Sequence, residues 1–397
     1  MGRIPVFIIS LLCVLTYSNA DHRFFFLDET VFTGGFFDGL QTWQDIWLKN
    51  FFGNYRPIVV LYLKFIYEMF GNNYQYYHLL SLALFLAVCL LFYSIVLEIT
   101  EDKDLSLLTV SLFAVHPIHH VFVTYKTMGC LMIYVILLQL AFLCCLKYLK
   151  GGATLLYGLS LAFFSLGLFA HEMQAFLPVY IAIYMHFIQR KNWKSIFKVC
   201  LSYAPILICY LFLRGSIQDV RPIDTLLHLK LSLCSYVSSL LPPIYIYVSK
   251  LFVPLEIVLV WNTPVITKHA LEGVILFLIL VLCLGYLIMI KWKTGLKAFS
   301  LAFFLAGFLP FGIAGFVYTH WSQSVFLETH WFTFSSIGFF LLAGRMFMAL
   351  RKKWPVTYWG GLVVLVLVGL SLTTRWYNAV WQNERGYLAY WHKIDFY

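Results

Sequence analysis

Two adjacent carboxylates, Asp28 and Glu29, are the first side chains in this sequence whose type and spacing suit chemistry. They follow the apolar run 24–27, and a carboxylate held beside an apolar wall at a membrane surface has a raised pKa. Such a group can act as a general base or hold a divalent cation. A solvated turn is the other interpretation of the pair.

Three histidines, His116, His119 and His120, form a second group within FAVHPIHHVFVTYK. Their spacing of i, i+3 and i+4 places them on one face of a helix, although Pro117 opposes a continuous helix there. Three imidazoles could ligate zinc or relay protons. Because no carboxylate lies close to them in the sequence, structural hydrogen bonding is the simpler interpretation, and the identity of any metal ligand stays open.

A third group lies in the short turn at His171-Glu172, between two apolar runs. Glu172 falls almost at membrane depth, where a charged side chain should face protein or a polar cavity. Arg56, in NYRP, could bind a lipid phosphate or anchor the chain at headgroups. Glu328 and His330 belong to the same predicted face, and this convergence is more informative than any single residue.

The composition sets the environment in which these groups must act. Of 397 residues, 61% are hydrophobic and 12% are charged, against about 45–50% and about 25% in soluble domains. A water-soluble globule is therefore excluded. The formal charge of +10 needs no nucleic-acid partner, because membrane proteins retain Lys and Arg on the cytoplasmic side.

The apolar runs predict an all-α polytopic membrane protein with about eleven transmembrane helices. We expect one membrane domain, 1–397, with a long first external loop at about 19–76 and a short external tail at 375–397. Prolines interrupt 226–270, which we expect to be re-entrant or interfacial. The expected spans are 4–18, 77–98, 105–118, 129–148, 153–170, 175–188, 197–213, 271–291, 297–316, 332–350 and 356–374.

The orientation follows from the basic residues. With the N-terminus inside, the segments rich in Lys and Arg, such as 189–198 and 345–355, all lie on the cytoplasmic side. Ser18-Asn19-Ala20 resembles a signal-peptidase site, so the run 4–18 is either a retained first helix or a signal peptide. The nine cysteines show no paired spacing, and we expect neither a disulfide framework nor a zinc site from them.

In their order, these segments resemble the membrane half of the transmembrane and tetratricopeptide-repeat O-mannosyltransferase family, which belongs to the GT-C class of glycosyltransferases. The similar strings are Asp28-Glu29, Tyr55-Arg56-Pro57, FAVHPIHHVFV, His171-Glu172 before LPVY, LFVPLEIVLVW, LETHWFTFSSIGF and SLTTRWYNAVWQNERGYLAYW. The sequence departs from the family at Val121, at KTMGC, at Thr329 and in lacking the repeats after Trp391.

The resemblance implies a GT-C-like fold that transfers a sugar from a polyprenyl-phosphate donor to a hydroxyl of a protein or glycolipid on the external face. It implies Asp28 or Glu29 as general base, and Arg56 as the phosphate ligand with Lys126 or Arg214 in reserve. Contacts to the sugar, or support for the residues that make them, would come from His116, His119, His171, Glu172, Glu328 and His330. A divalent cation at the acidic pair is a candidate cofactor, and no other is expected.

Two other functions fit the same residues. A lipid-linked saccharide flippase or carrier would also need many spans and external charges, although no paired broken helices are evident. A non-catalytic scaffold would explain the departures from the family strings. The missing repeats favour a bacterial inner membrane over the endoplasmic reticulum.

Overall fold

The computed structural model describes most of the chain. The ranges are 2–20, 27–32, 35–40, 42–49, 54–71, 73–217, 228–266, 295–318 and 323–394, without the side chains of residues 27, 28, 38 and 391–394. The expected span 271–291 lies outside these ranges.

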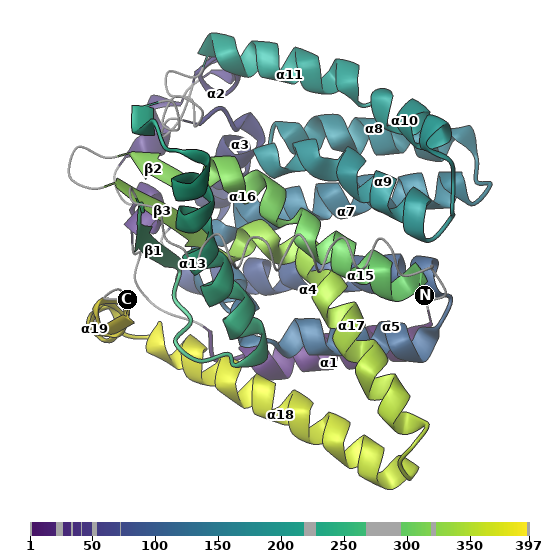
Figure 1. Cartoon of the computed structure of the whole chain (residues 1–397). Helices are drawn as coiled ribbons and strands as arrows, with labels where there is room; N and C mark the ends of the chain where they lie inside the picture. The colour runs from purple at the N-terminus through teal and green to yellow at the C-terminus, as the bar shows by residue number, and fades with distance from the viewer. Residues whose placement is uncertain are drawn as a thin grey trace.

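Helices arranged side by side make up most of the protein and run between two ends of a bundle (Figure 1). The helices of the bundle and its periphery are α1 (Arg3–Tyr17), α4 (Tyr74–Thr100), α5 (Lys103–Val115), α7 (Gly129–Leu149), α8 (Thr154–Leu168), α9 (Leu177–Phe187), α10 (Trp193–Leu201), α11 (Ala204–Ile217), α15 (Gly295–Ala306), α16 (Phe308–Ala314), α17 (Thr333–Arg351) and α18 (Val356–Val380). The other helices are α2 (Trp43–Trp47), α3 (Pro57–Phe70), α6 (Val121–Thr124), α13 (Leu233–Phe252) and α19 (Glu384–Ile394).

Five helical segments in the described ranges are long and apolar enough to cross a membrane, and two bent helix pairs raise the number to seven. The bent pairs are 103–115 with 117–124 and 193–201 with 204–217, while α1 and α8 are shorter apolar helices. These segments confirm a predominantly helical protein with several candidate membrane spans. The count of eleven remains a prediction.

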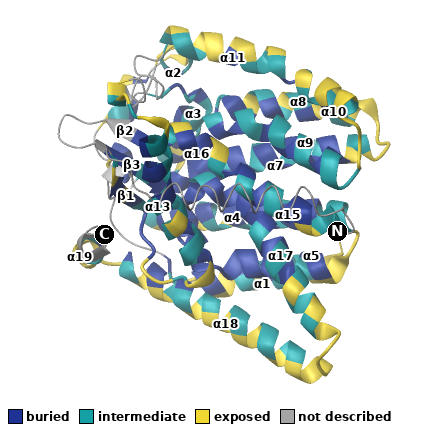
Figure 2. Cartoon of the chain, in the orientation of Figure 1, coloured by how far each residue is buried: buried dark blue, intermediate teal, exposed yellow. Residues whose placement is uncertain are grey.

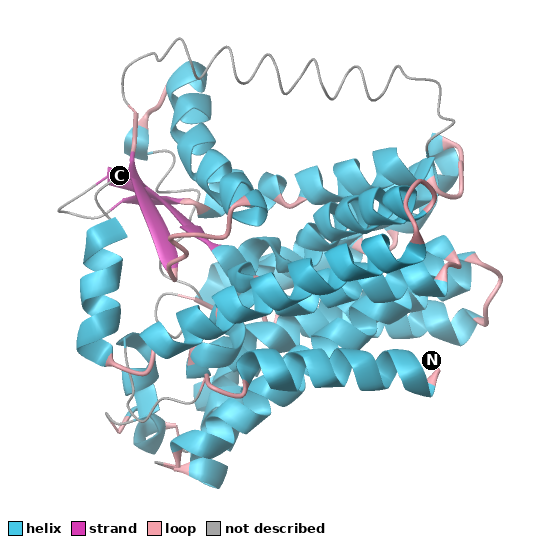
Figure 3. Cartoon of the chain, turned by 90° about the horizontal axis from the view of Figure 1, so that it is seen from below, coloured by secondary structure: helices cyan, strands magenta, loops and turns pink. Residues whose placement is uncertain are grey.

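A small antiparallel sheet interrupts the helical pattern at one end of the bundle, which we call the sheet end (Figures 1 and 3). Its strands are β1 (Val260–Pro264), β2 (Phe316–Tyr318) and β3 (Gln323–Glu328), in the order β1-β3-β2. Val260 pairs with Glu328, and Phe316 pairs with Val325. The expectation of an all-α chain missed this sheet, because each strand is only three to six residues long.

The proline-interrupted region 226–270 forms α13 and β1 within its described part. Pro242 and Pro243 lie inside α13, and a proline within a helix removes an intrahelical hydrogen bond. Helix α13 lies at the sheet end (Figure 1), so the described part of 226–270 is at the same end of the bundle as the sheet.

The opposite end is held by ion pairs between turns. Lys150 Nζ lies 2.8 Å from Glu101 Oε1 and 3.4 Å from Glu98 Oε1, and Arg351 Nη1 lies 2.7 Å from Asp104 Oδ2. All five residues belong to segments predicted to be cytoplasmic. The turns after α4, α7 and α17 therefore meet at one end, as the sequence-based topology requires.

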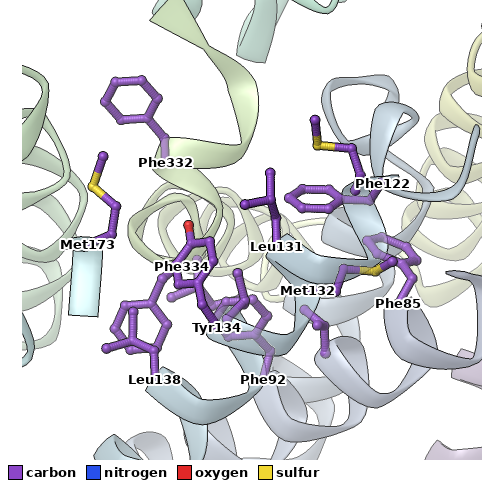
Figure 4. Packing of buried hydrophobic residues seen from close by; sticks show 14 of the residues in the cluster. Phe85, Phe92, Phe122, Leu131, Met132, Tyr134, Leu138, Met173, Phe332 and Phe334 are labelled. Carbon is purple, nitrogen blue, oxygen red and sulfur yellow. The ribbon is translucent and has the colours of Figure 1, made fainter. Parts of the chain in front are cut away.

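Aromatic side chains fill the centre of the bundle. Figure 4 shows Phe92, Tyr134 and Phe334 gathered between α4, α7 and α17, and the rings of Phe92 and Phe334 stack at 5.9 Å. By contrast, α18 and α11 carry exposed residues along their outer faces (Figure 2). Helix association in lipid depends on close packing and polar contacts rather than on the hydrophobic effect. The aromatic centre and the exposed outer helices match that environment.

Polar side chains of α18 satisfy the C-terminal carbonyls of two other helices. Asn378 Nδ2 donates to the Thr16 carbonyl of α1 and to Asn19 Oδ1, each at 3.0 Å. Thr374 Oγ1 donates to the Val115 carbonyl, at the end of α5, at 2.7 Å. The last four carbonyls of a helix have no partner within that helix. Helix α18 thereby caps both neighbours at the sheet end.

We expect Asn378→Leu to lower the free energy of unfolding by about 1–3 kcal/mol, because the Thr16 carbonyl and the Asn19 side chain each lose a donor. Chemical unfolding of the purified protein in detergent measures this change. Thr373→Val, on the same helix but bonded only to the Gly369 carbonyl, is the matched control and should behave like the wild type. Equal stability of Asn378→Leu and the wild type would contradict the capping role.

Candidate functional site

Three charged residues from distant segments meet at the sheet end. Arg56 donates from Nε and Nη2 to Glu172 Oε2, at 3.0 and 2.7 Å. Arg214 Nη2 lies 3.0 Å from the other carboxylate oxygen, Oε1. We call Arg56, Glu172 and Arg214 the arginine cluster. A single carboxylate thus joins two guanidinium groups.

Local structure explains why these side chains meet. Arg56 is the N-cap of α3, whose first residue is Pro57, a position where proline's missing N–H is harmless. The Ile58 N–H donates to the Phe169 carbonyl at 3.2 Å, which joins the start of α3 to the turn containing Glu172. Farther along α3, the Tyr62 hydroxyl packs against Gly129 of α7, where a Cβ would require the Tyr62 ring to shift. The small side of Gly129 thus accommodates Tyr62 at the contact of α3 with α7.

The electrostatics of the arginine cluster keep Glu172 ionised. Burial raises the pKa of the Glu172 carboxyl, but Arg56, followed by His171 and then Arg214, moves the pKa well below its ordinary value. Burial lowers the pKa of His171 to about 3, and the Arg56 charge adds to this effect. His171 is therefore neutral near pH 7, and its Nδ1 accepts the Met173 N–H at 3.2 Å.

A second group extends from the arginine cluster toward β3. His330 Nδ1 lies 3.1 Å from Glu328 Oε2, and the rings of His330 and His171 meet edge to face at 6.0 Å. Tyr134 packs against the His171 ring at 4.6 Å and donates its hydroxyl to the His330 carbonyl at 3.0 Å. The two groups therefore adjoin each other.

The predicted catalytic Glu29 has a different environment. Glu29 lies in the 3-10 helix η1 (Leu27–Phe32), is fully buried and accepts a hydrogen bond from the Lys126 backbone N–H. Lys126 Nζ lies 3.9 Å from Glu29 Oε2, and this amine is only 2% exposed. Glu29 thus anchors the backbone at Lys126. Solvent barely reaches Glu29, the predicted base, or Lys126, a predicted phosphate ligand, so neither predicted role agrees with this burial. The side chain of Asp28 lies outside the described part.

The predicted sugar-binding histidines His116 and His119 occupy the core. His116 Nδ1 accepts the Ile118 N–H, and its Nε2 lies 3.2 Å from the Leu251 carbonyl. His119 is 1% exposed, packs on Phe113 at 4.1 Å and makes no hydrogen bond through either ring nitrogen. Their contacts are with backbone and aromatic groups, because the helix breaks at Pro117. Within the described ranges, no cluster of three or more His, Cys, Asp or Glu could hold a metal ion.

Sequence reasoning missed the tyrosines that surround these charges. Tyr210 of α11 is 2% exposed and packs on Phe169 at 5.7 Å and on Tyr55 at 6.4 Å. Tyr134 lies within the apolar run of α7. In a chain with 26 Tyr, nothing in the sequence distinguishes these two residues. Their role becomes visible only through the contacts with His171 and with the turn after α8.

No protein-family model matches the chain, and no curated protein matches it at a significant level. The similarity to the O-mannosyltransferase family therefore rests on the quoted sequence strings alone. Any assignment of function depends on the residues at the sheet end.

We expect Glu29→Gln to lower the free energy of unfolding by about 3 kcal/mol, because the change removes the negative charge that lies 3.9 Å from the buried Lys126 ammonium. Glutamine retains an oxygen that can accept the Lys126 N–H, so the variant isolates the effect of charge. Chemical unfolding in detergent is the measurement. Glu68→Gln, whose 60% exposed side chain pairs with Lys64 at 3.3 Å, is the control and should change little. Unaltered stability of Glu29→Gln would argue against a structural ion pair.

We expect Glu172→Gln to destabilise the protein more at pH 7 than at pH 3. The folded-state pKa of Glu172 is lowered, so its contribution is complete above the unfolded value of about 4.3 and is lost as the pH falls from there through the lowered folded-state pKa. The difference in unfolding free energy between wild type and variant should therefore be constant down to about pH 5 and shrink toward pH 3. A difference that stays constant from pH 7 to pH 3 would contradict this electrostatic account.

Proposed function

We propose that this protein is a GT-C-type membrane glycosyltransferase that transfers a sugar from a polyprenyl-phosphate donor to a hydroxyl of a protein or glycolipid. The observation that carries the proposal is the arginine cluster at the sheet end. Two guanidinium groups around one carboxylate are a suitable receptor for the donor phosphate. The resemblance of the sequence strings supports the same reaction.

The donor capacity of Arg56 favours an anionic ligand. A guanidinium has five N–H donors, and the bonds to Glu172 use one on Nε and one on Nη2. The side chains of Arg56 and Arg214 are 26% and 15% exposed, so both are partly accessible to solvent. Three N–H groups of Arg56 are therefore not engaged by Glu172. A phosphodiester oxygen could accept hydrogen bonds from these groups.

The position of the arginine cluster suits a lipid-linked substrate. Arg214 lies in the last turn of α11, whose Ile208, Leu211 and Phe212 are exposed. A polyprenyl chain needs an apolar surface next to a phosphate site, and exposed apolar helix faces provide one. The ion pairs of the predicted cytoplasmic turns lie at the opposite end. We therefore propose that the sheet end is external.

The chemistry requires little beyond positioning. The acceptor hydroxyl attacks the anomeric carbon, and the polyprenyl phosphate leaves with the electron pair of the broken carbon–oxygen bond. Charge that develops on the phosphate is stabilised by Arg56 and Arg214. Asp28 is the base that the resemblance implies. The buried pair of Glu29 and Lys126 is assigned to structure, and no metal is needed for these steps.

We expect Arg56→Gln and Arg214→Gln each to weaken donor binding by about 10- to 100-fold, since a hydrogen bond to a charged group contributes about 1.5–3 kcal/mol. Proteoliposomes with labelled polyprenyl-phosphate hexoses measure binding and transfer together. Arg351→Gln, at the opposite end, is the matched control and should retain wild-type binding. Arg56→Lys keeps the charge but loses the two-point contact, and should fall between wild type and Arg56→Gln.

Three outcomes would contradict the proposal. Donor that crosses the bilayer without being consumed would identify a carrier. Donor binding without transfer to any acceptor would identify a scaffold. Wild-type donor affinity in both arginine variants would remove the phosphate site from the arginine cluster.

A further inference from the structure

We propose that α10 is a docking helix for anionic phospholipids at the end of the bundle opposite the sheet end. Its exposed side carries a stripe of apolar side chains, which we call the apolar stripe and which consists of Trp193, Phe197 and Leu201. Two lysines, Lys194 and Lys198, lie beside this stripe. Acyl chains would cover the apolar stripe, and the lipid phosphates would bind the lysines. The inference concerns a surface outside the arginine cluster and does not depend on the proposed transferase function.

Hydrogen bonds fix the position of α10 at this end of the bundle. Gln189, in the turn before α10, donates from Nε2 to the Leu149 carbonyl at the end of α7, at 3.0 Å. The next residue of that turn is Lys150, which forms the ion pairs described above. Asn192 then caps α10, since its side chain accepts the Ser195 N–H at 2.9 Å. Helix α10 therefore begins at the level of the turns that are predicted to be cytoplasmic.

The two sides of α10 differ in their surroundings. On the inner side the helix packs against α9, and Ile196 is only 3% exposed. On the outer side Trp193, Phe197 and Leu201 are 67%, 65% and 53% exposed. They are four residues apart, so they share one face of the helix. The indole of Trp193 stacks on the His186 ring at 4.8 Å, which holds it in place. Contiguous exposed apolar side chains mark a surface that contacts lipid or a partner.

The charge beside the apolar stripe favours an anionic lipid over a neutral one. Lys194 and Lys198 are exposed, and each follows a member of the stripe by one position. They are four residues apart and therefore form a second row along the same helix. The sequence from 173 to 217 contains no Asp or Glu, so no carboxylate within this stretch offsets their charge. Phosphate oxygens of an anionic headgroup suit such a row of ammonium groups.

The lysines also determine the depth of α10 in the membrane. A lysine on the lipid-facing surface is costly at the centre of a bilayer, so an exposed pair places the helix at the level of the headgroups. Tryptophan prefers the same level. The bend of 41° between α10 and α11 directs α10 off the axis of α11, so the lysines need not follow α11 into the bilayer. Figure 2 shows exposed residues along α10. An amphipathic helix of this kind lies in the membrane interface with its apolar side toward the acyl chains.

Quenching of Trp193 fluorescence by brominated lipids tests the inference in the full-length protein, reconstituted in nanodiscs of phosphatidylcholine. The Trp193 signal is the difference between wild type and Trp193→Phe. Brominated phosphatidylglycerol and brominated phosphatidylcholine are titrated into the discs in two separate series. We expect half-maximal quenching at about a 10- to 30-fold lower mole fraction of phosphatidylglycerol, since each lysine near a membrane contributes about fivefold.

Lys194→Gln/Lys198→Gln should make the two series coincide, with the Trp193 signal again obtained by adding Trp193→Phe. Lys103→Gln/Lys147→Gln is the matched control, because it removes two exposed lysines at the same end of the bundle. It should retain the wild-type preference for phosphatidylglycerol. All four lysines are exposed, so thermal unfolding should show wild-type stability in both variants and thereby exclude misfolding. High salt should weaken the preference of the wild type, since it screens exposed charges.

Three results would overturn the inference. Equal quenching by the two lipids in wild type would show that the lysines do not select anionic headgroups. Unchanged selectivity in Lys194→Gln/Lys198→Gln would place the anionic-lipid site elsewhere. Absence of quenching at Trp193 by either lipid would place α10 outside the bilayer and leave its surface to a soluble acidic partner. None of these results bears on donor binding by the arginine cluster, so the two proposals can fail separately.

Discussion

The carboxylate of Glu172 is the constraint on which the sheet end depends. It joins Arg56, from the segment before α3, to Arg214, near the end of α11, and follows His171 directly. Two guanidinium groups near a membrane would repel each other without it. Because all three groups are only partly exposed, their mutual attraction is weakly screened by solvent. The geometry around the proposed phosphate site is therefore set by one acidic side chain.

The structure separates two kinds of ionic contact at this end. Glu29 and Lys126 are almost completely buried and also linked through a backbone hydrogen bond. The arginine cluster and Glu328 retain exposed fractions between 15% and 28%. A buried pair fixes the fold locally, whereas a partly exposed group can also contact a substrate. This distinction favours Arg56 and Arg214 over Lys126 as phosphate ligands.

The sequence indicated the polar residues of the site but not their pairing. Arg56, Glu172 and Arg214 are conspicuous because charges beside apolar runs are rare, yet the contact between Arg56 and Glu172 spans 116 residues and leaves no local signal. The helical spacing of His116 and His119 suggested a shared polar face, but the break at Pro117 placed His119 among phenylalanines. The strand ending at Glu328 was missed for another reason. Its pairing partners are far away in the sequence, and its pattern alone is weak.

The capping of α1 by α18 has a consequence for synthesis of the chain. Asn378, which donates to the Thr16 carbonyl, lies 362 residues farther along the chain, so this carbonyl at the end of the first helix lacks its donor until nearly the whole polypeptide has been inserted. At a few to some tens of residues per second, that interval is on the order of tens of seconds. During this time the Thr16 carbonyl needs water, a lipid headgroup or an insertion factor as a temporary partner. Maturation of this protein is thus expected to be late and cooperative, with its earliest helix among the last to reach its final environment.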